Sequence, residues 1–227
     1  MQEIIAEIGQ NHGGSIEFAK ALIDLAKQAG ADTVKFQWYN TDLIYRKDDP
    51  WRDTAKRCEL TKKDVKNLMD YCEVRGIEFL TSVFDTNRVK WCEELGVKRY
   101  KIACRSFDDE ELLDAVEATG KPVIQSIPYD IGIWQPRKNF KYLYCVNKYP
   151  ASADEVDVLN VDFSKYDGFS DHTIGTAVPV LAMFQGAGII EKHFTTDRRL
   201  PGPDHKCSMT PGELETLVRF KMLIGDE

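Results

Sequence analysis

Residues 3–37, EIIAEIGQNHGGSIEFAKALIDLAKQAGADTVKFQ, contain a complete strand–helix–strand pattern. The two ends, residues 3–9 and 32–37, are β-rich runs of the length of short buried strands. Between them, apolar residues recur at three- and four-residue intervals, which predicts an amphipathic helix; they are Phe18, Leu22, Leu25 and Ala26. Gly30 follows where a left-handed residue after a helix is expected. The segment therefore predicts an α/β fold.

The same alternation continues along the rest of the chain. Further β-rich runs occupy residues 78–83, 99–103, 122–127, 142–147, 167–172 and 189–195. Helical patterns lie between them, and Gly76, Gly96 and Gly120 each follow one. Thr210-Pro211-Gly212-Glu213 is typical of a helix N-terminus. Eight strands alternating with helices predict a (β/α)8 TIM barrel, and a doubly wound open sheet is the alternative.

Two connections of this predicted barrel are thin. Residues 128–141 contain two prolines and show no helical period. Residues 150–166 have room only for a short helix around Asp154–Leu159. Since the chain contains no linker, repeat or low-complexity stretch, we expect a single domain over residues 1–227.

Composition narrows the class of protein. The formal charge is 30 − 37 = −7 with no basic run, which argues against a nucleic-acid-binding protein. No stretch approaches the roughly 18 consecutive apolar residues of a membrane span, and the N-terminus lacks a basic leader region. The six cysteines are scattered without C-x-x-C spacing, so we expect reduced, mostly buried thiols. Together these features predict a cytoplasmic protein with no nucleic-acid or membrane partner.

Polar residues occupy the C-terminal end of every predicted strand. This is the end at which the βα loops of a barrel form the active-site face. The residues are Glu7, Lys35, Gln37, Ser82, Asp85, Lys101, Ser126, Asn147, Ser170, His172, Glu191 and His193. A solvated strand end would explain one such residue, but eight strands in phase indicate a site.

Two histidines of this set suggest a metal. His172 and His193 end neighbouring strands, and adjacent strands lie only about 4.8 Å apart, so one ion can contact both imidazoles. Imidazole with carboxylate or water suits Mn, Fe, Co or Zn. Lys35 and Lys101 supply point charges for a phosphate or carboxylate, and the serine hydroxyls add donors. The sequence therefore predicts an anion-binding, metal-dependent site.

Three long motifs, residues 4–37, YDGFSDHTIG (166–175) and IIEKHFTTDRRLPGPDHKCSMTPGEL (189–214), resemble the sialic acid (N-acetylneuraminate) synthase family. That family condenses phosphoenolpyruvate with an N-acyl amino sugar to give a 2-keto-3-deoxy sugar acid and phosphate. The resemblance extends from about residue 3 to residue 220. It implies a transferase of carbohydrate biosynthesis built on a TIM barrel.

The resemblance also implies a role for individual residues. His172 and His193 match metal ligands, for Mn²⁺ or Mg²⁺, and Lys35 and Lys101 match lysines that hold phosphoenolpyruvate. Further positions that line this pocket are Ser82, Ser126, Asn147, Tyr149, Ser170 and Glu191. Glu7 and Asp204 match acidic residues of the active site, and we expect Glu7, Glu191 or Asp204 to move protons.

The chain departs from the family pattern on the sugar side. The family's K-I-x-S-G-E becomes Lys101-Ile102-Ala103-Cys104-Arg105-Ser106, and its S-T-G-M becomes Ser126-Ile127-Pro128-Tyr129. The family's C-terminal antifreeze-like domain is not found in these 227 residues. A monomer and a homodimer are therefore both open, and a separately encoded antifreeze-like domain is a further possible partner. Two alternative functions stay open: the same chemistry on another aldose or a phosphorylated sugar, and a non-catalytic anion-binding barrel.

Overall fold

Eight parallel strands close into a barrel in the computed structural model, which describes residues 2–132 and 136–225. In chain order they are β1 (Glu3–Gly9), β2 (Thr33–Trp38), β3 (Glu78–Val83), β4 (Tyr100–Ile102), β5 (Val123–Pro128), β6 (Phe140–Cys145), β7 (Gly168–Asp171) and β8 (Ile189–His193). Each strand pairs with the next, and β8 pairs with β1. This closure confirms the predicted TIM barrel and excludes the open sheet.

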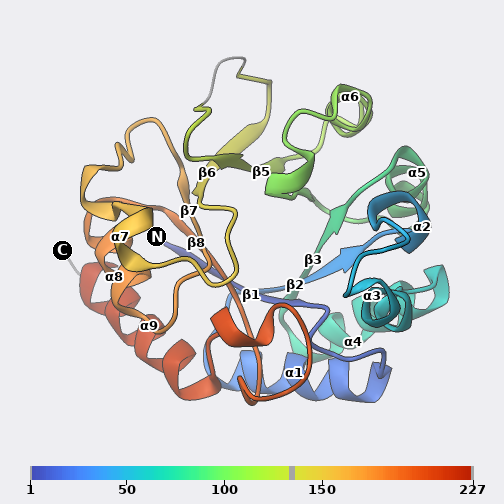
Figure 1. Ribbon diagram of the computed structural model, residues 1–227, viewed down its shortest axis with the longest axis horizontal. Helices are drawn as coiled ribbons and strands as arrows, with labels where there is room; N and C mark the ends of the chain where they lie inside the picture. The colour runs from blue at the N-terminus through green and yellow to red at the C-terminus, as the bar shows by residue number, and fades with distance from the viewer. Residues whose placement is uncertain (1, 133–135, 226–227) are drawn as a thin grey trace.

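Helices surround the strands as an outer layer (Figure 1). They are α1 (Ile16–Gln28), α2 (Thr41–Ile44), α3 (Arg52–Cys58), α4 (Lys62–Arg75), α5 (Thr86–Leu95), α6 (Glu110–Glu117), α7 (Ala153–Val156), α8 (Ala177–Phe184) and α9 (Pro211–Gly225). Three short 3₁₀ helices are η1 (Cys104–Ser106), η2 (Val158–Asn160) and η3 (His205–Cys207). None of the helices within the described ranges combines the length and apolarity that a membrane span requires.

Local signals explain several helix ends. The Thr61 side chain accepts a hydrogen bond from the Asp64 backbone, while Asp64 accepts one from the Thr61 backbone, and this capping box begins α4. Gly76 ends the same helix at φ 65°, a left-handed conformation that glycine adopts without steric cost. At the start of α9, the Glu213 carboxylate accepts hydrogen bonds from the backbone and hydroxyl of Thr210, as the sequence predicted.

The thin connections are where the predicted boundaries need correction. Strand β6 begins and ends two residues earlier than the predicted run 142–147. The predicted short helix around 154–159 divides into α7 and η2, because Asp157 adopts φ 45° and ends the α-helical turn. The β5–β6 connection forms no helix in its described residues, as predicted, and residues 133–135 lie outside the described ranges.

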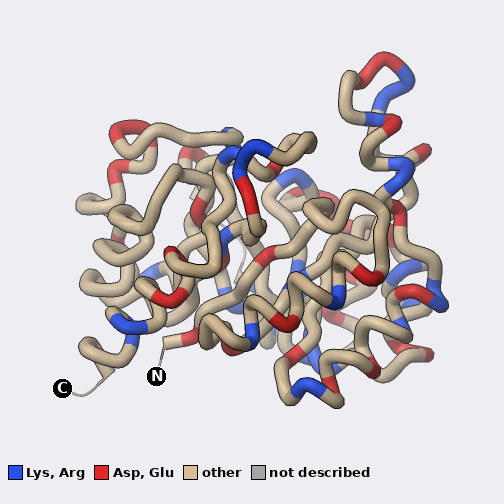
Figure 2. The backbone as a smooth tube through the Cα atoms, turned by 90° about the horizontal axis from the view of Figure 1, so that it is seen from below, with Lys and Arg blue, Asp and Glu red and all other residues tan. Residues whose placement is uncertain are grey.

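Two apolar layers position the site. Inside the barrel, one layer of side chains fills the interior below the strand ends: Ile5, Leu80, Ile124, Leu143 and Ile189. A larger buried cluster fills the space between strands and helices. Along the backbone, Lys and Arg are interspersed with Asp and Glu (Figure 2). On β1, β3, β5 and β8 the residue two positions beyond this layer is polar, and these residues belong to the floor of the barrel mouth: Glu7, Ser82, Ser126 and Glu191.

Candidate active site

A layer of buried polar side chains lies directly above the apolar interior. Its members are Glu7, Lys35, Ser82, Lys101, Ser126, Ser170 and Glu191, and each is at most 6% exposed. Strand register explains their proximity, because Glu7 pairs with Lys35, Ser82 with Lys101, and Ser170 with Glu191. These residues were predicted from their positions at the strand ends, and the structure places them side by side.

Two lysines share one carboxylate in this layer. Lys35 Nζ lies 2.9 Å from Glu7 Oε2 and 3.7 Å from Glu191 Oε2. Lys101 Nζ lies 3.5 Å from Glu191 Oε1. Each ammonium also donates to a serine hydroxyl, Lys35 to Ser82 at 2.9 Å and Lys101 to Ser126 at 2.7 Å. The result is a compact cationic floor with Glu191 between its two charges.

The three acidic residues near this floor differ in their protonation. Burial raises the pKa of Glu191, but Lys101, Lys35 and the Ser170 hydroxyl outweigh burial and hold that pKa below its usual value. Burial raises the pKa of Glu7 above its usual value, and Lys35 offsets this only in part. Burial, followed by the nearby Glu7, raises the pKa of Asp204 to about 7. Glu191 is thus a carboxylate and Asp204 can carry a proton near neutral pH, whereas Glu7 is protonated more readily than an ordinary glutamate.

The two predicted metal ligands lie side by side, with imidazole centroids 5.6 Å apart. His172 Nδ1 lies 2.9 Å from the Val146 carbonyl oxygen. Since a carbonyl only accepts, Nδ1 carries the proton and Nε2 has a free lone pair. Burial lowers the pKa of His172 to about 4 and also lowers that of His193, so both rings are neutral at pH 7.

The donor set fits a divalent cation. His193 Nδ1 is buried without a hydrogen-bond partner in the described part of the chain, and Asp204 Oδ2 lies 3.8 Å from it. A neutral imidazole whose other nitrogen donates to a carbonyl is the usual form of a metal-bound histidine. The described residues contain no preassembled group of three or more His, Cys, Asp or Glu around one point. The protein would therefore supply two ligands, and water or substrate oxygens the others.

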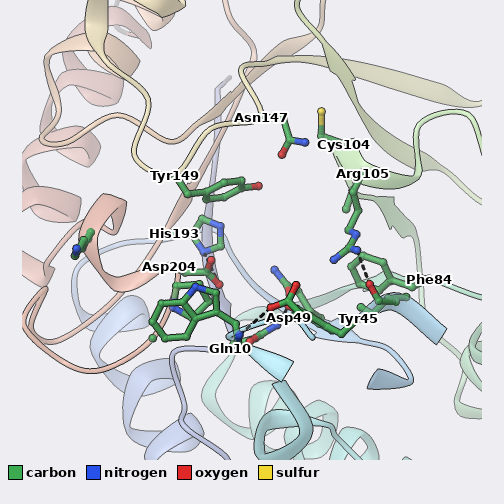
Figure 3. A pocket seen from close by; sticks show the side chains of 17 residues that line it. Gln10, Tyr45, Asp49, Phe84, Cys104, Arg105, Asn147, Tyr149, His193 and Asp204 are labelled. Carbon is green, nitrogen blue, oxygen red and sulfur yellow. Dashed lines mark hydrogen bonds and ion pairs between the residues drawn. The ribbon is translucent and has the colours of Figure 1, made fainter. Parts of the chain in front are cut away.

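A pocket of about 600 Å³ opens above the floor. Tyr149, His193 and Asp204 form one wall, and Arg105 and Phe84 face them across the pocket (Figure 3). The Tyr149 ring lies 4.0 Å from that of His172, centroid to centroid, so the tyrosine packs directly against the histidine pair. Asn147 and Cys104 also line this space.

Several lining residues were missed by the sequence reasoning. Gln10 donates to the Tyr45 hydroxyl at 2.6 Å, and Lys206 lies on the rim. Arg105 donates to the Ile44 carbonyl oxygen, and its guanidinium lies 5.4 Å from the Tyr45 ring centroid. Gln10 lies in a turn and Tyr45 directly follows α2. Arg105 and Lys206 lie in the short 3₁₀ helices η1 and η3, which are too short to show a periodic pattern. The departure at Cys104–Ser106 was the one available signal.

Three polar residues near the predicted site have structural roles. Asp85 begins α5, where its side chain accepts a hydrogen bond from the Arg88 backbone. His205 Nδ1 lies 2.8 Å from the Thr195 hydroxyl. Asp197 pairs with the exposed Arg199.

Comparison with known proteins adds independent information. The family model described as "NeuB family" matches residues 22–223. The N,N'-diacetyllegionaminic acid synthase of Legionella pneumophila is 36% identical over 95% of this chain and 70% of its own length. The human N-acetylneuraminate-9-phosphate synthase is 32% identical over 97% of this chain and 69% of its own length. The crystal structure of an N-acetylneuraminic acid (sialic acid) synthetase from Leptospira borgpetersenii, in complex with citrate, superposes with a TM-score of 0.89. It is 32% identical and covers 97% of this chain and 82% of that one.

Proposed function

The chain belongs to the NeuB family, and on that basis we propose that it condenses phosphoenolpyruvate with an N-acyl amino sugar. The proposed acceptor is of the N-acetylmannosamine type, and the products are a sialic-acid-like 2-keto-3-deoxy sugar acid and phosphate. The observation that carries the proposal is the buried floor of Lys35 and Lys101 beside two neutral histidines. A small dianionic substrate and a divalent cation suit this combination of charges.

Phosphoenolpyruvate binds to the floor in this proposal. The Lys35 and Lys101 ammonium groups offset its phosphate and carboxylate charges, and Ser82, Ser126, Asn147 and Ser170 supply hydrogen bonds. Glu191, ionised between the lysines, holds both ammonium groups in place before the substrate arrives. Preorganised charge of this kind is often the largest contribution to catalysis.

Bond formation joins C3 of phosphoenolpyruvate to the aldehyde carbon of the open-chain sugar. Water adds at C2, and the tetrahedral centre loses phosphate by C–O cleavage. Asp204 protonates the aldehyde oxygen, and its pKa of about 7 together with its position in the pocket wall supports this role. Water that adds at C2 releases a proton, which the Glu7 carboxylate accepts and returns to the departing phosphate; the raised pKa of Glu7 makes it a stronger base.

His172 and His193 would hold the metal, for which we propose Mn²⁺ or Mg²⁺. Bound there, the ion would act as a Lewis acid towards the aldehyde oxygen and as a template for both substrates. Tyr149 packs against His172 and closes that side of the pocket. The pocket volume of about 600 Å³ suits a hexosamine above the floor.

A phosphorylated sugar is the second candidate acceptor. Arg105 and Lys206 both line the pocket, and neither cation forms an ion pair with a carboxylate of the described residues. An acceptor phosphate would complement these two charges.

Phosphate release tests the proposal directly. The purified protein is incubated with phosphoenolpyruvate, Mn²⁺ and a panel of N-acyl hexosamines with and without a 6-phosphate. We expect phosphate release that depends on both the sugar and Mn²⁺, and the preferred sugar distinguishes the two acceptors. If no sugar stimulates release, the non-catalytic anion-binding barrel is the better description.

A further inference from the structure

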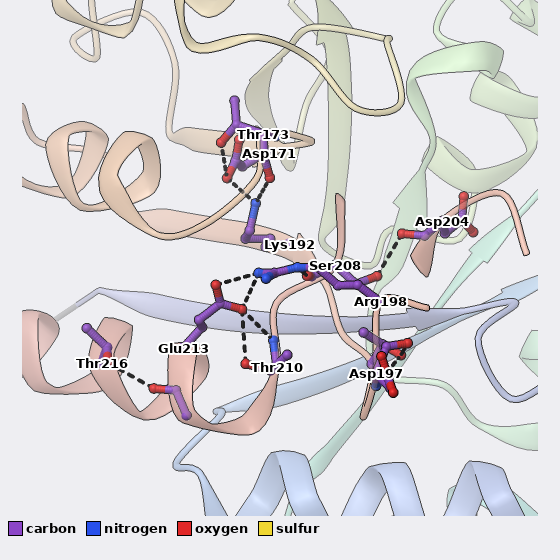
Figure 4. A network of polar contacts seen from close by, with 12 residues as sticks. Asp171, Thr173, Lys192, Asp197, Arg198, Asp204, Ser208, Thr210, Glu213 and Thr216 are labelled. Carbon is purple, nitrogen blue, oxygen red and sulfur yellow. Dashed lines mark hydrogen bonds and ion pairs between the residues drawn. The ribbon is translucent and has the colours of Figure 1, made fainter. Parts of the chain in front are cut away.

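A fully buried ion pair between Asp171 and Lys192 joins β7 to β8, and its side chains point away from the barrel interior (Figure 4). Lys192 Nζ lies 2.6 Å from Asp171 Oδ2, and both side chains are 0% exposed. Asp171 is the last residue of β7, and Lys192 is its partner in the β7–β8 ladder. The next residue along each strand is one of the histidines, His172 after Asp171 and His193 after Lys192.

The same pair also binds the backbone that follows His172. The Asp171 carboxylate accepts from the Thr173 backbone N–H at 2.8 Å and from the Thr173 hydroxyl at 3.1 Å. Lys192 Nζ donates to the Thr173 carbonyl oxygen. Residues 171 and 173 are therefore tied to each other and to β8, with His172 between them.

Backbone pairing between β7 and β8 does not by itself hold His172 against β8. The register of β7 with β8 ends at Asp171 and Lys192, so His172 lies one residue beyond the last ladder pair. Its ring bonds to Val146 and its carbonyl accepts from the Ala151 backbone, and both contacts tie it to the segment after β6. The Asp171–Lys192–Thr173 network is what connects His172 to β8, the strand that carries His193.

We propose that Asp171, Lys192 and Thr173 are positioning residues that set the separation of the His172 and His193 imidazoles and thereby the affinity for the divalent cation. This inference rests on the metal site of the proposed function. Stability is a weak explanation for the pair, because desolvation of two buried charges offsets much of their attraction. Groups that orient metal ligands, in contrast, typically change metal affinity by about 10- to 100-fold when removed.

A hydroxyl substitution is the smallest test. Thr173→Val removes the hydroxyl donor and keeps the side-chain shape, whereas Thr173→Ser keeps the hydroxyl. Mn²⁺ binding is measured from the electron paramagnetic resonance signal of the free ion, without substrate. We expect Thr173→Val to weaken Mn²⁺ binding by up to about 10-fold, the lower end of the usual range, and Thr173→Ser to restore it. Equal affinity in all three proteins overturns the role of Thr173.

Substitution of the ion pair is the stronger test. Asp171→Asn leaves Lys192 buried without its counter-charge and can fail to fold, so the apolar double variant Asp171→Leu/Lys192→Met is measured beside it. Replacement of both charges by apolar groups is often neutral for stability. We expect this double variant to fold and still bind Mn²⁺ about 10- to 100-fold more weakly, with a changed visible spectrum of bound Co²⁺.

A control at the other end of the barrel separates stability from positioning. Glu3→Gln weakens the ion pair with Arg99, far along β1 from the histidines. We expect a lower unfolding midpoint and unchanged Mn²⁺ affinity. A folded Asp171→Leu/Lys192→Met protein that binds Mn²⁺ as tightly as the unmodified chain overturns the inference alone. Absence of Mn²⁺ binding by the unmodified chain overturns both the metal site and this inference. The proposed condensation reaction is tested independently, by sugar-dependent phosphate release.

Discussion

At the scale of single residues, Lys35 and Lys101 reach the same carboxylate from two sides. Lys101 has no second carboxylate within ion-pair distance among the described residues, whereas Lys35 also contacts Glu7. Burial lowers the pKa of Lys101, with Lys35 acting in the same direction and Glu191 opposing both. A bound anion would therefore stabilise the Lys101 ammonium more than the Lys35 ammonium, whose charge two carboxylates already neutralise.

We predict that Lys101→Met weakens phosphoenolpyruvate binding. A hydrogen bond to a charged group contributes about 1.5–3 kcal/mol, so the dissociation constant is expected to rise about 10- to 100-fold. Calorimetric titration with phosphoenolpyruvate measures this change. Lys121→Met is the control, because Lys121 pairs with Glu93 outside the barrel and should leave binding unchanged. Equal affinity in the two variants would remove Lys101 from the phosphoenolpyruvate site.

His12 provides a prediction about pH. Burial lowers the pKa of His12 to about 4, with Asp64 acting in the opposite direction. Between this value and an unfolded pKa of about 6.5, the unfolded chain binds more protons, so stability falls as the pH falls. The free energy of unfolding, measured in urea, should fall between pH 7 and pH 5. We expect this fall to be about 2 kcal/mol smaller in His12→Gln than in the unmodified chain. An identical pH dependence would show that His12 titrates normally in the folded protein.

Residue identities at the strand ends were predictable, but their protonation was not. The positions of Glu7 and Glu191 follow from the rule that βα loops form one face of a barrel. Glu191 is ionised because two lysines from different strands approach it, and Glu7 is more easily protonated because burial outweighs Lys35. Such differences depend on distances that a sequence does not contain. The roles assigned to these residues stay predictions.

At the scale of elements, β7 and β8 are the pair on which the histidine geometry depends. Gly168 opens β7 opposite Ile189, the first residue of β8. A Cβ at Gly168 would lie 2.1 Å from the Ile189 carbonyl oxygen, which no real contact allows. The strands can therefore approach as they do only because position 168 has no side chain.

We predict that Gly168→Ala destabilises the protein by about 3 kcal/mol, the upper end of the usual penalty for overpacking, because β7 must move away from β8. Urea unfolding measures this difference. Gly212→Ala is the matched control, since no atom lies within 4 Å of the added Cβ there and the position is helical. Comparable stability of the two variants would contradict the close approach of β7 to β8.

Element boundaries were predictable where periodic patterns and caps agree. The helix start at Thr210 and the glycines after α4 and α5 follow from local chemistry. The break between α7 and η2 depends on Asp157 at φ 45°, a conformation that an aspartate only sometimes adopts. The shift of β6 reflects pairing with β5, a tertiary effect that strand propensity does not capture.

At the scale of the whole molecule, closure of the barrel places the last strand, β8, beside the first strand, β1. His193 on β8 pairs in register with Glu7 on β1, and His172 follows β7. Counting alternating elements predicted this closure, because eight strands with helical crossovers have few other arrangements. The pocket wall above the floor was not predictable in the same way. Tyr45 follows the short helix α2, and Arg105 and Lys206 lie in the 3₁₀ helices η1 and η3, all of which are too short to show a periodic pattern.

A metal held between β7 and β8 would stabilise the entire barrel. A ligand that binds only the folded state adds about 2.7 kcal/mol when its concentration is 100 times its dissociation constant. We predict that saturating Mn²⁺ raises the midpoint of thermal unfolding relative to excess EDTA. The shift should disappear in His172→Ala/His193→Ala. His205→Ala is the control, because His205 is also buried but contacts Thr195 instead of the histidine pair. His205→Ala should lower the unfolding midpoint but keep the Mn²⁺-dependent shift, because the substituted residue lies in the segment after β8. An equal shift in the double variant would mean that Mn²⁺ binds elsewhere on the barrel, and a shift lost in His205→Ala would mean that the loop, with Asp204, supplies a metal ligand.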